Sequence, residues 1–366
     1  MERKKGPIDF PLFIVILLLL SIGINMVFSA SMYQDRQIYD DSYYHLKRQI
    51  IWAGLGIATM IFTSNINYKK LRNKKLISFG MVVTIVLLVV VLFMPAVKGA
   101  RRWIGIGSAG IQPSEVAKIM LIVYLSDNIT RKGEKIKDFW KGVVPVLLVA
   151  GVFAALILKE PNMSTAVIIM TVAFCLLFAG GAKMSQLLGL FGVGIAGAVG
   201  LIMAESYRMR RLFAFIDPWA DPLDAGYQAI QSLYALGAGG PFGSGFGMSR
   251  QKQYYIPEAQ NDFIFAIIGE ELGLLGVIFV ILLFAFLIWR GLKIALNCKD
   301  KFGSLLAVGI TGLIAVQSSI NLLVVASFMP ITGVTLPLIS YGGSSLLFTM
   351  AALGILLNIS RYQDRN

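Results

Sequence analysis

The chain has 366 residues, of which 57% are hydrophobic and only 14% are charged. This apolar content exceeds what a soluble domain of such length buries, so the composition excludes an ordinary soluble enzyme and favours a membrane protein. The net charge of +13 does not indicate a nucleic-acid partner, because the basic residues form short clusters between apolar runs instead of one continuous face.

Ten apolar runs follow one another along the chain and predict membrane-spanning helices. They cover 10–31, 49–63, 76–95, 113–129, 142–158, 163–180, 184–204, 262–289, 304–327 and 341–359. The first follows Arg3, Lys4 and Lys5 and is long enough to span, so we interpret it as a retained helix and not as a cleaved signal. The predicted fold is all-α: one polytopic membrane domain, residues 1–366, with about ten transmembrane helices.

The basic clusters also predict the orientation of the chain. If both termini are cytoplasmic, most Lys and Arg residues of the short connections fall on the cytoplasmic side, as expected for membrane proteins. We therefore expect a multi-pass protein of the cell membrane with both termini in the cytoplasm. The large loop 205–261, between the seventh and eighth helices, is then extracytoplasmic.

The large loop has room for a site. It opens with a cluster of three arginines, Arg208, Arg210 and Arg211. Residues 227–236 predict a short interfacial helix with Ile230, Leu233 and Tyr234 on one face. The glycine-rich stretch 237–247 follows no strand, which argues against a dinucleotide-binding loop.

Two carboxylates precede the eighth apolar run, in Ile256-Pro-Glu-Ala-Gln-Asn-Asp-Phe-Ile-Phe265. Pro257 suits the first turn of a helix, where Glu258 would face the positive helix end. Asp262 would lie one turn later on the same face, at the edge of the hydrocarbon, where a carboxylate is costly unless it is hydrated or paired. Asp262 is therefore a candidate base, although helix capping alone is an alternative explanation for both residues.

A second group of polar residues surrounds the start of the fourth predicted helix. Arg101, Arg102 and Trp103 are expected at the outer headgroup level, either as an aromatic belt with snorkelling arginines or as a cationic cradle for a lipid-linked diphosphate. Glu115 and Lys118 occupy successive turns of one helix face, which predicts an ion pair facing the bundle interior.

Three further features are informative. Residues 159–165 form a very short outer loop, and 327–345 contains prolines and glycines that break a helix near the outer face, which predicts a cavity because exposed backbone needs polar partners at membrane depth. The single histidine, His45, is predicted to be a solvated loop residue. The sequence has no Cys/His cluster of the kind that binds zinc.

Several of these stretches resemble the SEDS family (shape, elongation, division and sporulation), which includes FtsW, RodA and SpoVE, and the FtsW/SpoVE branch is the more similar. The matching stretches are Arg102-Trp-Ile-Gly105, Gln112–Lys118, Asp217-Pro218, Gly226-Tyr-Gln228, Gly243-Ser-Gly245, Ile256–Phe265, Gly269–Gly273 and Pro337–Ser344. The family usually has Pro-Asp where this chain has Pro161-Asn162, and an amide cannot act as a base.

The resemblance implies a glycosyltransferase that polymerises lipid II into glycan strands outside the cytoplasmic membrane and releases undecaprenyl diphosphate. It implies an essential aspartate at Asp262, and it places Trp103 and the Glu115/Lys118 pair at functionally sensitive positions. It also implies a class B penicillin-binding protein, a transpeptidase, as partner. The resemblance does not distinguish division, elongation and sporulation.

An inverting reaction needs a base for the incoming sugar hydroxyl and positive charge for the departing diphosphate. We assign Asp262 as the base. The predicted substrate-binding residues are Arg101, Trp103, Glu115, Lys118, Arg208, Arg210 and Glu258, with Arg211 as a further candidate for the diphosphate. A divalent cation, Mg²⁺ or Mn²⁺, is compatible with this chemistry, but no residue pattern requires a cofactor. The alternatives are a lipid II flippase or transporter, in which Glu115 and Lys118 line the path, and a non-catalytic scaffold for the transpeptidase.

Overall fold

The computed structural model describes residues 6–96, 99–105 and 110–363. Arg3, Lys4, Lys5 and Lys98, together with residues 106–109 of the second polar group, lie outside the described residues. Apart from short turns and an isolated bridge between Ile104 and Ile111, the regular structure of the described ranges is helical. The α-helices are α1 (Phe10–Tyr39), α2 (Tyr44–Asn65), α3 (Lys74–Val90), α4 (Pro113–Lys132), α5 (Val144–Lys159), α6 (Met163–Gly180), α7 (Met184–Met203), α8 (Ser206–Ile216), α9 (Tyr227–Gly239), α10 (Ile264–Asn297), α11 (Lys301–Val325) and α12 (Gly343–Ser360).

The predicted all-α, polytopic membrane architecture is confirmed. Within the described ranges, eight helices are long and apolar enough to cross a membrane: α1, α3, α5, α6, α7, α10, α11 and α12. The other two predicted spans correspond to α2 and α4. Both form helices, but α4 carries Glu115, Lys118 and Asp127 along its length, so the count of ten spans stays a prediction.

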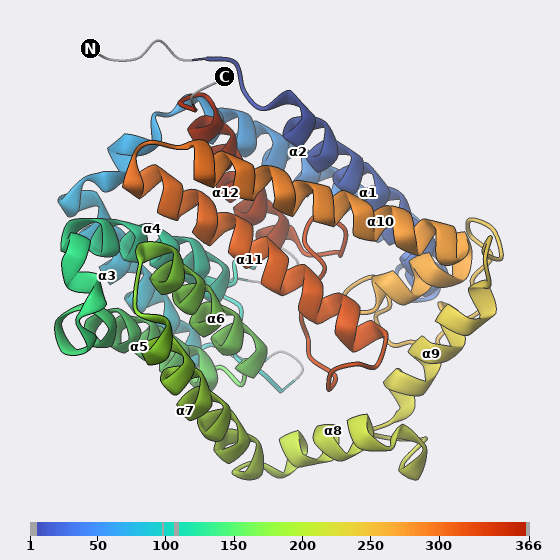
Figure 1. Cartoon of the computed structure of the whole chain (residues 1–366). Helices are drawn as coiled ribbons and strands as arrows, with labels where there is room; N and C mark the ends of the chain where they lie inside the picture. Colours follow the sequence, from blue (N-terminus) through green and yellow to red (C-terminus); the bar gives the residue numbers. More distant parts are fainter. Residues whose placement is uncertain (1–5, 97–98, 106–109, 364–366) are drawn as a thin grey trace.

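The helices pack as two neighbouring groups (Figure 1). One group contains α1, α2, α10 and α12, the other contains α3, α4, α5 and α6, and α11 contacts members of both. Small residues permit the closest approaches, as is usual between membrane helices. A Cβ on Gly354 of α12 would lie only 2.4 Å from the carbonyl oxygen of Met60 in α2. By contrast, α7 buries only Leu187 and leads into α8 at the periphery.

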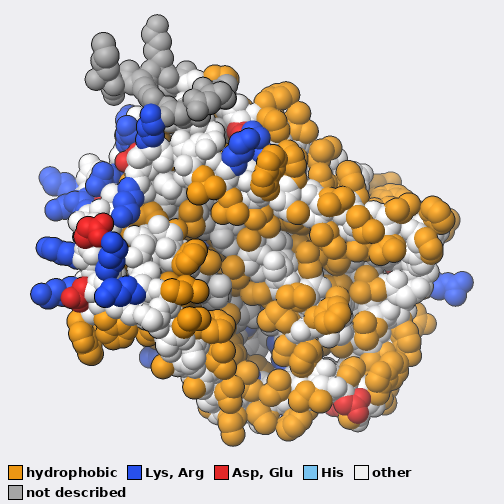
Figure 2. Space-filling view, viewed as in Figure 1, with side chains coloured by type: hydrophobic (Ala, Val, Ile, Leu, Met, Phe, Trp, Pro, Cys, Tyr) orange, Lys and Arg blue, Asp and Glu red, His pale blue; other side chains and the backbone are white. Residues whose placement is uncertain are grey.

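The two described ends of the chain meet at one end of the bundle (Figure 1). The backbone nitrogen of Gly6 donates to the carbonyl oxygen of Arg361 at 3.1 Å, and that of Asp9 donates to Ser360 Oγ at 2.9 Å. Figure 2 shows Lys and Arg side chains gathered along one edge, near the α2–α3 and α4–α5 connections. The two described chain ends therefore lie at the same end of the helix bundle.

The loop 205–261 contains two α-helices and a short 3₁₀ helix, Pro218–Ala220, whereas the sequence predicted one helix. The helix expected at 227–236 is confirmed as α9, and its position at the membrane interface stays a prediction. Ile230 is buried, whereas Leu233 and Tyr234 are 36% and 49% exposed. The face packed on α10 carries small residues because the backbones touch: a Cβ on Gly239 would lie 2.0 Å from the carbonyl oxygen of Gly269. Helix α8 was not predicted.

His45 is not a solvated loop residue, and that prediction is wrong. It lies in the first turn of α2, its side chain is 14% exposed, and its Nδ1 pairs with Asp35 of α1, whose side chain is fully buried. The backbone nitrogen of His45 also donates to Asp35 Oδ2 at 3.0 Å. A carboxylate buried at the end of α1 needs these partners, since an unpaired charge is unfavourable there.

Candidate functional site

The segment before α10 is a series of turns. The predicted helix through Pro257, Glu258 and Asp262 is wrong, because α10 begins only at Ile264. Glu258 has a φ of 49°, a left-handed conformation that an α-helix does not accommodate. Its Oε2 accepts a hydrogen bond from Asn261 Nδ2 at 3.0 Å. Glu258 therefore shapes a turn and does not cap a helix.

The turns before α10 are held by the irregular segment 326–342, which separates α11 from α12 as predicted. The backbone nitrogen of Tyr341 donates to the carbonyl oxygen of Gln260 at 2.9 Å. Asn321 of α11 donates through Nδ2 to two carbonyl oxygens, that of Asp262 at 2.8 Å and that of Val334 at 2.7 Å. One buried amide thus joins the two non-helical segments and satisfies backbone at membrane depth.

The Asp262 carboxylate is half-buried and lies against this segment. A Cβ built on Gly333 would be 3.3 Å from Asp262 Oδ2, tighter than most Cβ contacts. Glycine at 333 therefore leaves room beside the carboxylate.

Arg102 and Glu160 come from two other loops, and Arg102 lies close enough to Asp262 for their charges to interact. Arg102 Nε donates to the carbonyl oxygen of Glu160 at 3.2 Å, and its Nη2 donates to that of Pro161. The Glu160 side chain is fully buried, and neither of its carboxyl oxygens has a hydrogen-bond partner among the described residues. The sequence analysis named Arg102 only as part of a possible cationic cradle, and it did not select Glu160, although an acidic residue in a very short outer loop was a visible signal.

The charges of this group act on one another. Burial lowers the pKa of the Arg102 guanidinium, and the negative charges of Glu160, when it is ionised, and of Asp262 oppose that shift. Burial raises the pKa of Glu160 from 4.5 to about 8, despite the opposing charge of Arg102. At neutral pH Glu160 therefore holds a proton, and Arg102 keeps its charge because guanidinium is strongly basic.

Asn162, in the same short loop as Glu160, has a structural role at the start of α6. Its Oδ1 accepts a hydrogen bond from the backbone nitrogen of Thr165 at 3.3 Å and so caps α6. The carboxyl group of this loop is thus the one at position 160, two residues earlier than the position at which the resemblance would place an aspartate.

The remaining predicted cationic residues make contacts of their own. Arg101 donates to the carbonyl oxygen of Leu92 at 2.8 Å, Arg208 donates to that of Leu201 at 2.7 Å, and Arg210 pairs with Asp224 at 3.5 Å. Arg211 donates to the carbonyl oxygen of Ile331 at 3.3 Å, and its charge acts on Arg102. Of the arginines in α8, Arg211 is therefore the one directed to the Asp262 group.

Trp103 follows Arg102 in the chain, and the Glu115/Lys118 pair lies in the first two turns of α4. Trp103 is 37% exposed and its ring packs beside Gly110. The predicted ion pair is confirmed: Lys118 Nζ lies 2.8 Å from Glu115 Oε1, and both side chains are buried. Lys118 also donates to Gln317 Oε1 at 3.1 Å, and a small cavity lies beside this chain of contacts.

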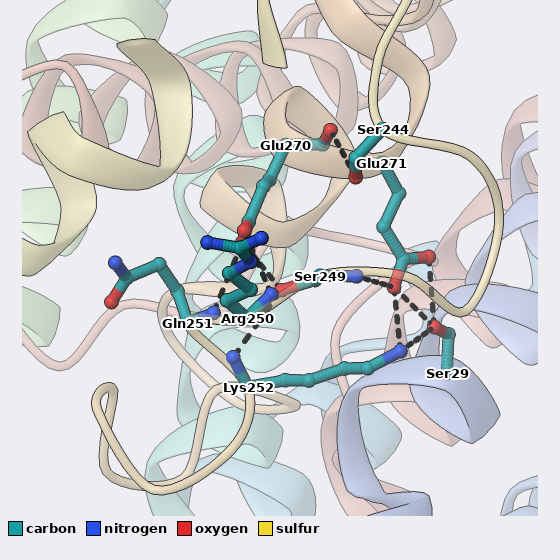
Figure 3. A network of polar contacts seen from close by, with 8 residues as sticks. All are labelled: Ser29, Ser244, Ser249, Arg250, Gln251, Lys252, Glu270 and Glu271. Carbon is teal, nitrogen blue, oxygen red and sulfur yellow. Dashed lines mark hydrogen bonds and ion pairs between the residues drawn. The ribbon is translucent and has the colours of Figure 1, made fainter. Parts of the chain in front are cut away.

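A buried polar network anchors the loop that carries Asp262 (Figure 3). Lys252 Nζ lies 2.7 Å from Glu271 Oε1 of α10 and 3.0 Å from Ser29 Oγ of α1, and the side chains of Lys252 and Glu271 have no exposed surface. The neighbouring carboxylate of Glu270 accepts hydrogen bonds from Ser249 Oγ and from the backbone nitrogen of Arg250, the latter at 2.8 Å. These bonds fix the 249–252 turn to two membrane helices.

The sequence of residues 10–365 matches the family model described as FTSW_RODA_SPOVE, cell cycle protein. The chain belongs to this family, the SEDS family. The predicted resemblance is confirmed.

Relatives of this SEDS chain span nearly its whole length. Stage V sporulation protein E of Bacillus subtilis (strain 168) is 44% identical over 367 residues, covering 99% of each chain. A probable peptidoglycan glycosyltransferase FtsW of Geobacter sp. (strain M18) is 39% identical, covering 98% of each.

Solved structures of SEDS relatives share the fold. A chain of a peptidoglycan synthase complex that coordinates polymerization and crosslinking superimposes with a TM-score of 0.79 at 29% identity, covering 98% of this chain and 99% of that one. Thermus thermophilus RodA, a rod shape determining protein, gives a TM-score of 0.71 at 27% identity, covering 98% of each chain.

The described part of this SEDS chain contains no group of three or more His, Cys, Asp or Glu side chains arranged to hold a metal ion.

Proposed function

We propose that this chain is a peptidoglycan glycosyltransferase that polymerises lipid II on the extracytoplasmic face of the cell membrane. The observation that carries the proposal is that Arg102 brings together Asp262 and Glu160, with the three side chains coming from three loops. The chain also belongs to a family with relatives named probable peptidoglycan glycosyltransferase FtsW. A carboxylate, a guanidinium and a protonated carboxyl group supply a base, a positive charge and a hydrogen-bond donor.

Asp262 accepts the proton of the GlcNAc 4-hydroxyl while that oxygen attacks the anomeric carbon of MurNAc with inversion, and undecaprenyl diphosphate departs. Arg102 and Arg211 balance the charge that develops on the leaving diphosphate. Glu160, in its protonated form, donates a hydrogen bond to a substrate oxygen. Arg101, Arg208 and Arg210 act at the rim, where they attract the lipid headgroup.

The same proposal covers orientation and partner. Both termini lie in the cytoplasm, because the basic edge in Figure 2 and the two described chain ends are at the same end of the bundle. All ten apolar runs, α2 and α4 included, cross the membrane. The partner is a class B penicillin-binding protein, in keeping with the synthase complex that contains a structural relative.

The test is glycan polymerisation by the purified chain reconstituted with labelled lipid II. Asp262→Asn is nearly isosteric and should lower the rate by roughly 10²–10⁴-fold, the usual contribution of a general base, without loss of folding. Asp224→Asn, which changes an exposed aspartate of the same large loop, is the matched control and should retain activity. Undiminished polymerisation by the Asp262 variant would refute the assignment.

The same vesicles separate the proposal from its alternatives. Polymer formed without a partner supports the enzyme. Transfer of lipid II between leaflets without polymer would identify a flippase. The observation that favours this alternative is the buried Glu115/Lys118 pair beside a cavity. If neither occurs until a transpeptidase is added, and Asp262→Asn then has no effect, the chain is a scaffold.

A further inference from the structure

An open cleft of about 710 Å³ lies at the end of the bundle that holds the two described chain ends, away from the Asp262 group. It is formed by the α2–α3 connection, the start of α3 and the end of α4. The lining residues are Lys69, Lys70, Arg72, Asn73, Leu76 and Arg131. Four of these six are cationic and none is acidic, so the cleft favours an anion. Figure 2 shows the basic edge to which it belongs.

The buried carboxylate of Asp127 in α4 binds the two arginines of the cleft. This carboxylate is only 7% exposed; its Oδ1 accepts from Arg72 Nε at 3.3 Å, and its Oδ2 accepts from Arg131 Nε at 2.6 Å. Arg131 Nη2 also donates to the carbonyl oxygen of Arg72 at 3.4 Å. The side-chain bond uses the inner nitrogen of Arg72, and the side chain is 42% exposed, so its two terminal nitrogens are accessible to an external acceptor.

The binding of both arginines by one buried carboxylate is not needed to orient the chain in the membrane. A cytoplasmic loop needs only positive charge to orient a membrane protein, whereas two guanidinium groups fixed on one buried carboxylate are preorganised for bidentate contact with phosphate. Lys69 and Lys70 add compact charges at the rim, where each can follow a phosphate oxygen. Four cations against one carboxylate leave the cleft with an excess of three positive charges.

An apolar strip continues from the cleft along α3. Leu76, which lines the cleft, is 49% exposed, and Phe79, Val83 and Val86 below it are 69%, 38% and 52% exposed. These residues are three or four positions apart, so they lie along one face of the helix. A cationic recess followed by an apolar helix face is complementary to a phospholipid, which has an anionic phosphate group and apolar acyl chains.

We propose that this cleft binds the phosphate headgroup of an anionic phospholipid, whose acyl chains lie along the outer face of α3. The lipid bridges the α2–α3 connection to the end of α4. This site is independent of the glycosyltransferase assignment, because none of its residues belongs to the Asp262 group.

The test measures binding of phosphatidylglycerol and phosphatidylcholine to the full chain in detergent micelles by native mass spectrometry. The variant Lys69→Gln/Lys70→Gln should lose roughly 30-fold (about 2 kcal/mol) in phosphatidylglycerol affinity, since each basic residue contributes about 1 kcal/mol near an anionic lipid. Both lysines are exposed, so the fold should be retained. Arg72→Lys keeps the charge but removes the guanidinium group that can contact phosphate through two nitrogens, and it should also weaken phosphatidylglycerol binding.

The matched control is Lys135→Gln/Lys141→Gln, which removes the same charge from exposed residues of the α4–α5 connection, outside the cleft. It should leave the affinity nearly unchanged. Equal losses in both pairs would attribute binding to bulk charge and overturn the proposal. So would equal affinity of the parent for the two lipids, or displacement of phosphatidylglycerol by an equal concentration of inorganic phosphate, which would assign the cleft to a soluble anion.

Discussion

Removing the ammonium group of Lys252 should destabilise the protein strongly, because its partner Glu271 would remain buried and unpaired. In the variant Lys252→Met the Glu271 carboxylate keeps Ser29 Oγ, at 2.7 and 2.8 Å, and the backbone nitrogen of Ser249 at 3.3 Å. Loss of one member of a buried ion pair costs about 3–5 kcal/mol. The two remaining donors favour the lower end of that range.

The assay is denaturant unfolding in mixed micelles, followed by tryptophan fluorescence, for the parent, Lys252→Met, Glu271→Met and the double variant. The double variant should be far more stable than the sum of the single losses predicts, because it contains no unpaired charge. The control is Lys137→Met, which breaks an exposed pair of similar geometry, 2.6 Å from Glu134, and should cause no measurable loss.

If Lys252→Met unfolds at the same denaturant concentration as the parent, the network in Figure 3 does not hold the loop, and the reasoning from burial is refuted. A double variant as unstable as the sum of its single changes would refute the pairing in a different way. Either result would mean that other contacts position the loop that carries Asp262.

Three further outcomes are expected. The folded protein retains the proton of Glu160 between pH 4.5 and about 8, whereas the unfolded chain releases it. The stabilisation of the folded state by this proton is therefore complete below pH 4.5 and disappears as the pH rises to about 8. Glu160→Gln should flatten the pH dependence of the melting temperature in that window. Gly333→Ala should slow polymerisation roughly tenfold by displacing Asp262, whereas Gly151→Ala, with open space around its Cβ, should not, and equal rates would contradict the crowding argument. Asn321→Leu removes two hydrogen bonds from the site and should cost about 1–3 kcal/mol in unfolding free energy for each carbonyl left unpaired; an unchanged unfolding midpoint would show that water replaces the amide.

Features that depend on nearby residues could be predicted from the sequence. The apolar runs correspond to helices because a span needs only a sufficient length of apolar side chains, and their residues supply that locally. The Glu115/Lys118 pair was predictable because residues three apart on a helix are neighbours wherever the helix lies. Asp262 was selected by its position at the edge of an apolar run and by the family motif around it.

Features that depend on distant residues could not be predicted. The turns before α10 replace the predicted helix because Glu258 adopts a left-handed conformation and Tyr341, from the far end of the chain, binds Gln260. His45 is only partly exposed and is paired, because Asp35 of the neighbouring helix binds it. A helical periodicity contains no information about either partner.

The sequence by itself determined that this chain is a helical membrane protein of the SEDS family with a carboxylate at residue 262, since hydropathy and motifs are properties of consecutive residues. Only the tertiary structure decided which side chains surround that carboxylate. Arg102 reaches the carbonyl oxygen of Glu160 across 58 positions, and Asn321 reaches that of Asp262 across 59. Contacts over such separations arise from the packing of whole helices, which no local pattern specifies.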